Sequence, residues 1–332
     1  MNKSAVWGNY YSNGYLPWDT KAPSSHLLYY LNQCPSLIAR KGNEDIFIPD
    51  CQPVKGEYKA RQGQLLHICP DCQKMKPSQG LQTNCLELAC GTGSSCIYMA
   101  KVFTMGRSIG LDLVAEAVSS SRSLAAEEGV LHNCAFMQAD VFSLQTPGTR
   151  WDVEAAWALS QQQHKDLMEL SAEASSALKK EEDIKDDSRS TRRSPPTFRA
   201  HPREATEMAV HTSSTSDVPL HSDAPPKPTY LFDFIYDCQA FHALRHVDEA
   251  AYLQLLHSSL KPGGLLMLLT GNANEPDCGP SVLTKQDLLL AFPDSLWEWV
   301  FLVQSRFDAT PAYVAPGRDR LPLAWWGLVR KR

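Results

Sequence analysis

Hydrophobic and polar positions along the chain fall into two alternating patterns. Short apolar runs with strand character are followed by stretches in which apolar residues recur at helical spacing. The five runs are CLELAC (85–90), SIGLDL (108–113), CAFMQADVF (134–142), YLFDFIYD (230–237) and LLMLLT (265–270). This alternation predicts a parallel sheet with right-handed crossovers. Two aromatic runs, WEWVFLVQSRF (297–307) and LAWWGLVRKR (323–332), predict an antiparallel strand pair at one edge.

Helices are expected between these strands. The helical stretches are GSSCIYMAKVF (93–103), VAEAVSSSRSLAAEEG (114–129), DEAAYLQLLHSSL (248–260) and TKQDLLLAF (284–292). Thr284 and Asp287 have the spacing of a capping box, in which the two residues bond each other's backbone N–H groups. The α/β domain therefore begins near residue 84 and continues to the C-terminus.

Two polar segments interrupt this pattern. Residues 150–229 are rich in Ser, Thr, Pro and mixed charge, and we expect them to be largely disordered, with a helix in the first third. Residues 34–83 are rich in Gly, Pro, Lys and Gln. We treat both as insertions, which leaves an N-terminal segment (1–33) and two halves of one domain (84–149 and 230–332).

Composition narrows the class of protein. The 332 residues carry a formal net charge of −5, so no overall basic field favours nucleic acid. No apolar run approaches the roughly 20 residues needed to cross a bilayer. We expect a cytoplasmic protein that binds neither nucleic acid nor membrane. The 150–229 insertion could recruit a protein substrate or partner.

Residues that could bind a ligand stand at the carboxyl ends of the first three strands. Gly91 and Gly93 occupy the turn after the first strand, where glycine allows close approach of a ligand to the backbone. Asp112 ends the second strand, a position that offers a carboxylate to ribose hydroxyls, and Asp140 ends the third, within reach of an adenine edge. Glu87 precedes the turn and suits a cationic ligand better than a diphosphate.

In this order and spacing the chain resembles the class I S-adenosylmethionine-dependent methyltransferases. The resemblance rests on Glu87-x-Ala89-x-Gly91-x-Gly93, Asp112, Ala139-Asp140 and the Lys-Pro-Gly-Gly turn at 261–264. It implies a Rossmann-like, seven-stranded, mostly parallel sheet with an antiparallel edge hairpin and helices on both faces. It also implies S-adenosylmethionine as cofactor. By the same resemblance, Glu87, Ala89, Gly91 and Gly93 shape the methionine side, Asp112 holds the ribose and Asp140 the adenine.

The acceptor side is expected just past the fourth strand, in YDCQAFHALRH (236–246). Asp237 and His242 are our candidate catalytic residues, as pocket-lining groups of which one accepts a proton. The alternative is that they only cap and pack. His242 and His246 have the spacing of helical zinc ligands, but no third ligand stands beside them, and we predict no catalytic metal.

The N-terminal segment has a second resemblance. GYLPWDTKAPSSHLLYYL (14–31) is similar to the thiopurine, thiol and halide methyltransferases, with its Pro-Trp-Asp before a helix. Trp18 could then cover the cofactor as an aromatic lid, since a sulfonium cation is attracted to an aromatic face. The other interpretation makes Trp18 and Asp19 a hydrophobic staple and a helix cap.

The 34–83 insertion holds a CPDC motif at 69–72, and Cys51, Cys69 and Cys72 with His67 or Cys85 could complete a tetrahedral zinc site. Cysteines of a surface loop are the alternative.

The sequence thus predicts a methyltransferase that acts on a small-molecule acceptor such as a thiol or a halide. A protein (lysine) methyltransferase, or a protein of this fold that binds partners without activity, are the alternatives.

Overall fold

The computed structural model describes residues 3–33, 38, 46–49, 82–144, 151–190, 231–275, 280, 283–314 and 320–332. The chain divides into two compact units, Met1–Gln163 with Thr229–Arg332, and His164–Pro228. The first unit contains the sheet and the candidate site. Helix α7 (Val153–Ser190) begins in the first unit, where Trp151, Val153 and Ala156 are buried, and continues into the second.

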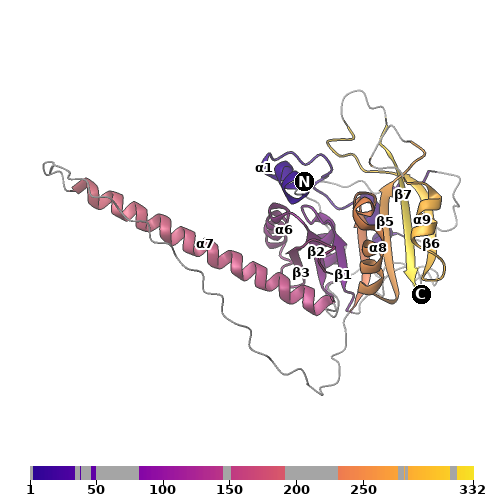
Figure 1. Cartoon of the computed structure of the whole chain (residues 1–332), viewed down its shortest axis with the longest axis horizontal. Coiled ribbons are helices and arrows are strands. Elements are labelled where there is room, and N and C mark those ends of the chain that lie inside the picture. The colour runs from indigo at the N-terminus through magenta and orange to yellow at the C-terminus, as the bar shows by residue number, and fades with distance from the viewer. Residues whose placement is uncertain are drawn as a thin grey trace, which may run out of the picture. The chain divides into compact units, whose positions relative to one another are not determined.

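A seven-stranded sheet forms the centre of the first unit (Figure 1). Its strands are β1 (Cys85–Leu88), β2 (Ser108–Asp112), β3 (Cys134–Gln138), β4 (Phe232–Cys238), β5 (Leu260–Gly271), β6 (Trp297–Arg306) and β7 (Leu323–Lys331). Their order is β3-β2-β1-β4-β5-β7-β6. The pairs among β1 to β5 are parallel, and β7 is antiparallel to both β5 and β6. This confirms the predicted sheet and its antiparallel edge.

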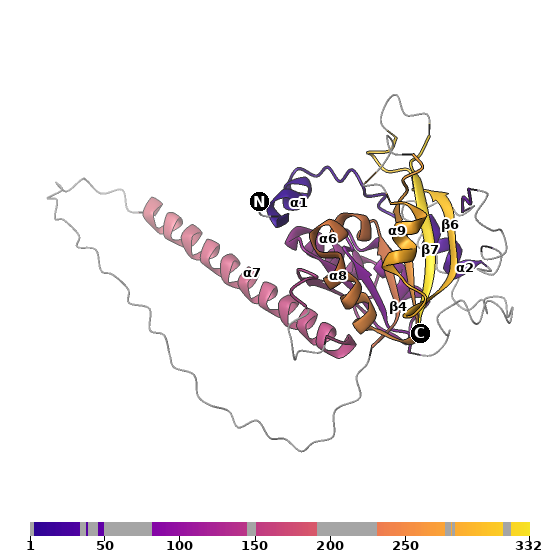
Figure 2. The same cartoon turned by 45° about the vertical axis from the view of Figure 1, so that its right-hand side comes forward.

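Both faces of the sheet are covered by helices (Figure 2). The helices of this unit, besides the start of α7, are α1 (Lys3–Ser12), α2 (Ser25–Asn32), α5 (Ser94–Val102), α6 (Ala115–Glu127), α8 (Phe241–Ser259) and α9 (Lys285–Ala291). Residues of α2, α5 and α6 pack in one apolar core with Phe234 and Tyr236. Residues of α8, α9 and the start of α7 pack in the other core with Ile235. Because successive side chains of a strand point to opposite faces, a strand buried on both faces is a continuous apolar run.

Two helix starts differ in how well the sequence predicted them. Thr284 and Asp287 form the expected capping box at the start of α9. Helix α8, expected from Asp248, begins at Phe241 and contains non-helical backbone at Asp248. Asp248 accepts a hydrogen bond from the Ala251 N–H at 2.9 Å, so it marks the start of the second of two helical segments, where the sequence placed the helix.

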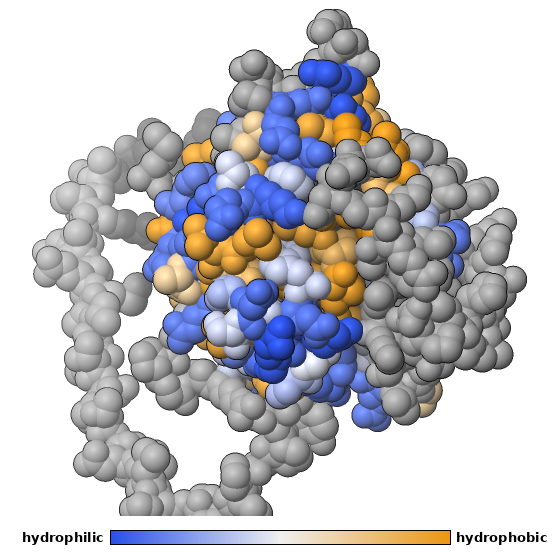
Figure 3. All heavy atoms as spheres, turned by 90° about the vertical axis from the view of Figure 1, so that its right-hand side faces the viewer, coloured by the Kyte–Doolittle hydropathy of each residue, from blue (hydrophilic) through white to orange (hydrophobic). Residues whose placement is uncertain are grey.

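The outer side of the sheet edge, with β6, β7 and α9, faces the viewer in Figure 3, where hydrophobic and hydrophilic residues are mixed. Among the described residues, no helix combines the length and the apolar character needed to cross a membrane.

Candidate functional site

The turn between β1 and α5 has an unusual backbone. Ala89, Gly91 and Gly93 have φ angles of 51°, 57° and 77°. At Gly93 a Cβ atom would lie 2.6 Å from the ring of Phe136, closer than such atoms come in proteins. Gly93 is therefore required for both conformation and space. Ala89 is exposed and Gly91 is half-buried at this turn.

Asp112, at the end of β2, holds this turn in place. Its Oδ2 accepts a hydrogen bond from the Gly91 N–H at 2.9 Å, and its Oδ1 accepts one from the Val114 N–H at 2.9 Å. The hydroxyl of Ser121 donates to the Gly91 carbonyl at 2.8 Å. Burial raises the pKa of Asp112, and the bonds from Val114 and Gly91 oppose that rise. The predicted ribose-binding residue thus lies against the predicted glycine turn.

Glu87 lies in β1 directly before the turn and is only 5% exposed. Burial raises its pKa to about 8; a backbone hydrogen bond from Cys96 lowers it, and the charge of Asp112 raises it further. Its Oε2 is buried without a hydrogen-bond partner among the described residues. A buried carboxyl oxygen without a hydrogen-bond partner favours a cationic ligand, because the ligand would supply the missing interaction.

The N-terminal segment packs over the glycine turn. A Cβ atom at Gly91 would lie 3.5 Å from the Tyr11 hydroxyl and 4.0 Å from Nε1 of Trp18. Trp18 contacts the rings of Trp7, Tyr10 and Tyr11 at centroid distances of 5.1, 5.1 and 6.2 Å.

Two details of this segment were not predicted. Tyr11 is a site residue that the sequence interpretation missed. Burial raises its pKa, and the charge of Asp112 raises it further. Helix α2 is capped by Ser24, and Asp19 bonds the Lys21 N–H instead, so the helix-cap alternative for Asp19 is wrong.

Asp140 follows β3 at the same edge of the sheet. Its side chain is exposed, and its Oδ1 accepts a hydrogen bond from the Phe142 N–H at 3.0 Å. The structure therefore brings Glu87, Gly91, Gly93 and Asp112 into direct contact or close proximity. Asp140 stands at the next strand end.

Asp237, at the end of β4, is fully buried and has three hydrogen-bond donors. Its Oδ1 accepts from the backbone of Ala240 and Phe241 at 3.0 and 3.1 Å, and its Oδ2 accepts from the Tyr252 hydroxyl at 2.7 Å. Burial raises its pKa to about 6, and these bonds oppose the rise. Asp237 thus fastens the start of α8 to β4.

His242 lies in the first turn of α8 with 6% exposure. Its Nδ1 lies 3.1 Å from the Thr270 hydroxyl and accepts from the Gly271 N–H at 3.4 Å. Burial and the neighbouring His246 lower its pKa to about 4, so the ring is neutral near pH 7 and carries its proton on Nε2.

The zinc hypothesis concerns residues that lie almost wholly outside the described part of the chain. Cys51, His67, Cys69 and Cys72 are not described, and Cys85 is buried in β1. His246 is exposed. Within the described ranges, no three His, Cys, Asp or Glu side chains are grouped to hold a metal ion.

Comparison with known proteins identifies the domain. Residues 85–181 match the family model described as a methyltransferase domain. The chain contains a methyltransferase domain. The matched range includes the glycine turn, Asp112 and Asp140. A comparison with curated protein sequences gave no match.

Solved structures of methyltransferases are also similar to this chain. An S-adenosylmethionine-dependent methyltransferase from Anabaena variabilis is 14% identical, with a TM-score of 0.45; the match covers 100% of this chain and 96% of the Anabaena chain. One from Aquifex aeolicus is 13% identical, with a TM-score of 0.39; the match covers 76% of this chain and 84% of the Aquifex chain. A third structure comes from work on the conversion of a disulfide bond into a thioacetal group during echinomycin biosynthesis. It is 14% identical, with a TM-score of 0.49, and the match covers 99% of this chain and 93% of that protein's chain.

Proposed function

We propose that this methyltransferase binds S-adenosylmethionine over the β1–α5 turn and transfers its methyl group to a small molecule. The observation that supports this most is the buried oxygen of Glu87, which has no hydrogen-bond partner in the described part of the chain, next to a turn that Asp112 holds in place. An ammonium group at the methionine end of the cofactor would give that oxygen the missing charge partner.

The other predicted residues would hold the rest of the cofactor. Each carboxylate oxygen of Asp112 can accept a second hydrogen bond besides the one from Gly91 or Val114, and these would come from the ribose hydroxyls. Asp140 would reach the adenine. Ala89, Gly91 and Gly93 would let the cofactor approach the backbone. Trp18 would cover it, since aromatic faces attract cations. When bound, the cofactor supplies an activated methyl group on a positively charged sulfur.

On the acceptor side we propose distinct roles for two residues. Asp237 is a positioning residue, because all its described contacts fasten α8 to β4. His242 lines the acceptor site as a neutral group, with Nε2 available to donate. Direct methyl transfer needs chiefly orientation and exclusion of water, so a small acceptor such as a thiol or a halide is compatible with this site.

The test is to incubate the full chain with methyl-labelled S-adenosylmethionine and cell extract. Label is then measured separately in volatile, small-molecule, protein and nucleic-acid fractions. We expect label in the volatile or small-molecule fraction, and its loss in Glu87→Gln. Glu127→Gln is the matched control, because Glu127 is exposed on α6. Label in protein would replace the proposal with a protein methyltransferase. If no fraction gains label, the fold serves another purpose, such as binding partners.

A further inference from the structure

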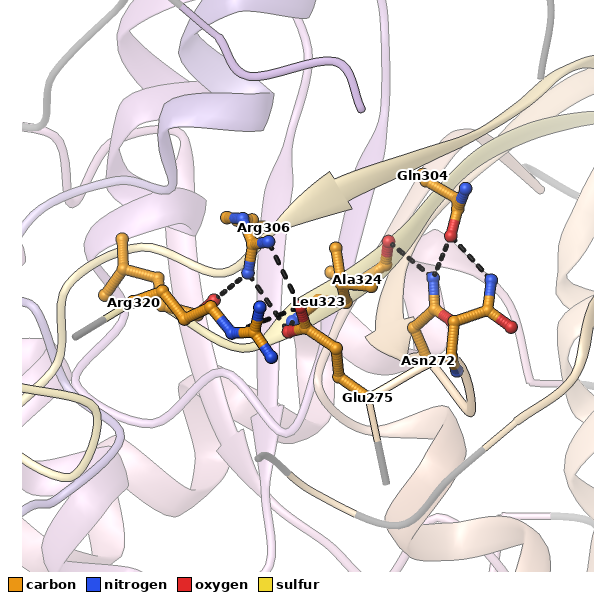
Figure 4. Close-up of polar contacts among 9 residues, drawn as sticks. Asn272, Glu275, Gln304, Arg306, Arg320, Leu323 and Ala324 are labelled. Atoms are coloured by element: carbon orange, nitrogen blue, oxygen red, sulfur yellow. Dashed lines mark hydrogen bonds and ion pairs between the residues drawn. The ribbon is translucent and has the colours of Figure 1, made fainter. Parts of the chain in front are cut away.

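The ends of β5, β6 and β7 carry a polar cluster whose groups bond one another (Figure 4). Glu275, which follows β5, receives both terminal nitrogens of the Arg306 guanidinium at 3.1 and 3.2 Å and lies 3.3 Å from Nε of Arg320. Beside it, the side-chain amide of Asn272 donates to the side-chain oxygen of Gln304 at 3.4 Å. Because these groups find their partners within the cluster, its role is to hold the strand ends together.

The polar groups over the β1–α5 turn are not paired in this way. The Tyr11 hydroxyl lies 3.5 Å from the position of a Cβ atom at Gly91, and Nε1 of Trp18 lies 4.0 Å from the same position. An indole N–H can only donate, so in the hydrogen bond between Trp18 and Tyr11 the hydroxyl oxygen is the acceptor. In the described part of the chain, no acceptor is bonded to the proton of this hydroxyl. Tyr11 therefore holds a free donor over the turn.

Asp112 lies against the same glycine. Its carboxylate accepts hydrogen bonds from the backbone N–H groups of Gly91, Leu113 and Val114, and none from Tyr11. A carboxylate has about four lone-pair sites, so Asp112 can still accept a further bond. A donor on Tyr11 and an acceptor on Asp112 thus both lie beside Gly91 without bonding each other.

The surroundings of the Tyr11 hydroxyl restrict the group that could bind between the two residues. Burial raises the pKa of Tyr11, and the charges of Asp112 and Asp19 raise it further, so these surroundings are negative. They disfavour an anionic group such as a carboxylate. An ammonium group has no lone pair with which to accept the Tyr11 proton. A ligand hydroxyl can do both, because it can donate to Asp112 and accept from Tyr11.

We propose that Tyr11 is a cofactor-binding residue that donates to a ribose hydroxyl whose own proton is bonded by Asp112. This inference rests on the proposed function, which assigns the ribose to Asp112. The two residues together require a hydroxyl on the sugar, so Tyr11 makes the site selective for a ribose over a deoxyribose. Because methyl transfer leaves the ribose unchanged, Tyr11 would stabilise bound S-adenosylmethionine and bound S-adenosylhomocysteine equally.

The experiment measures binding by calorimetry for four ligands. They are S-adenosylmethionine, S-adenosylhomocysteine, and the 2′-deoxy and 3′-deoxy analogues of S-adenosylhomocysteine. The full chain is tested as wild type, Tyr11→Phe and Tyr10→Phe. Phenylalanine keeps the ring of Tyr11 and removes only the hydroxyl. Tyr10 is the matched control, because it is the neighbouring residue of α1, its ring also contacts Trp18, and it is 37% exposed.

We expect Tyr11→Phe to weaken the binding of S-adenosylmethionine and of S-adenosylhomocysteine by the same factor, about 3- to 10-fold, which is the scale of one hydrogen bond. The deoxy analogue that lacks the bonded hydroxyl should bind Tyr11→Phe and the wild type equally well. The other analogue should lose as much affinity as S-adenosylhomocysteine does. Tyr10→Phe should behave as wild type.

Unchanged affinity of Tyr11→Phe for S-adenosylhomocysteine would overturn the inference. An equal loss of affinity for all four ligands would also overturn it, because that result indicates a purely structural effect of the hydroxyl. A wild type that fails to bind S-adenosylmethionine would instead overturn the proposed function.

Discussion

Replacing Gly93 by alanine tests whether the β1–α5 turn is built as the structure shows. An alanine would keep the φ of 77°, which costs about 1 to 2 kcal/mol for a residue with a Cβ atom. Its Cβ would also lie 2.6 Å from Phe136 and 2.9 Å from Cβ of Ser121, and such overpacking costs about 1 to 3 kcal/mol. The two costs add to about 2 to 5 kcal/mol of unfolding free energy.

Gly129→Ala is the matched control. Gly129 has a φ of 69°, but a Cβ atom there would meet nothing within 4 Å, so only the backbone cost of about 1 to 2 kcal/mol applies. Urea unfolding of the wild type and both variants, followed by circular dichroism, gives the two losses directly. Equal losses would refute the packing around Gly93.

Three further predictions concern charge, hydrogen bonding and the lid. With the pKa of Glu87 raised to about 8, the folded apo protein keeps a proton that the unfolded chain loses above about pH 4.5. The unfolding free energy of the wild type should therefore fall, relative to that of Glu87→Gln, as the pH rises from about 4.5 to about 8. Urea unfolding at several pH values checks this, and a constant difference would contradict it. Tyr252→Phe removes a donor from the buried Asp237 and should cost about 1.5 to 3 kcal/mol in thermal or urea unfolding, whereas the exposed Tyr15→Phe should be neutral. An equal effect of the two would count against this contact. Trp18→Ala should weaken cofactor binding in calorimetry by about 0.5 to 2 kcal/mol, and unchanged affinity would remove Trp18 from the site.

The sheet could be predicted from the sequence because its strands are buried on both faces. Runs such as the one at 265–269 are apolar on consecutive positions, which is a local signal. The glycine turn and Asp112 were equally readable, since a tight turn and a strand end are set by residues close together in the sequence. Their contact, the bond from the Gly91 N–H to Asp112, joins residues only 21 positions apart.

Other site residues depend on contacts between distant parts of the chain. Tyr11 reaches the glycine turn from the N-terminal segment. No local pattern marks this residue. For Asp237 the sequence left pocket lining and capping as alternatives. Its partner Tyr252 is only 15 positions away, but it lies beyond the kink at Asp248, which no pattern in the sequence predicted.

The measurement that tests the central claim most directly is a calorimetric titration of the full chain with S-adenosylmethionine. We predict saturable binding by the wild type, weakened at least about tenfold by Asp112→Ala, which is about 1.4 kcal/mol. Asp294→Ala, at the opposite edge of the sheet, should bind as the wild type does. No heat of binding, or an affinity that Asp112→Ala leaves unchanged, would contradict a cofactor site at the β1–α5 turn.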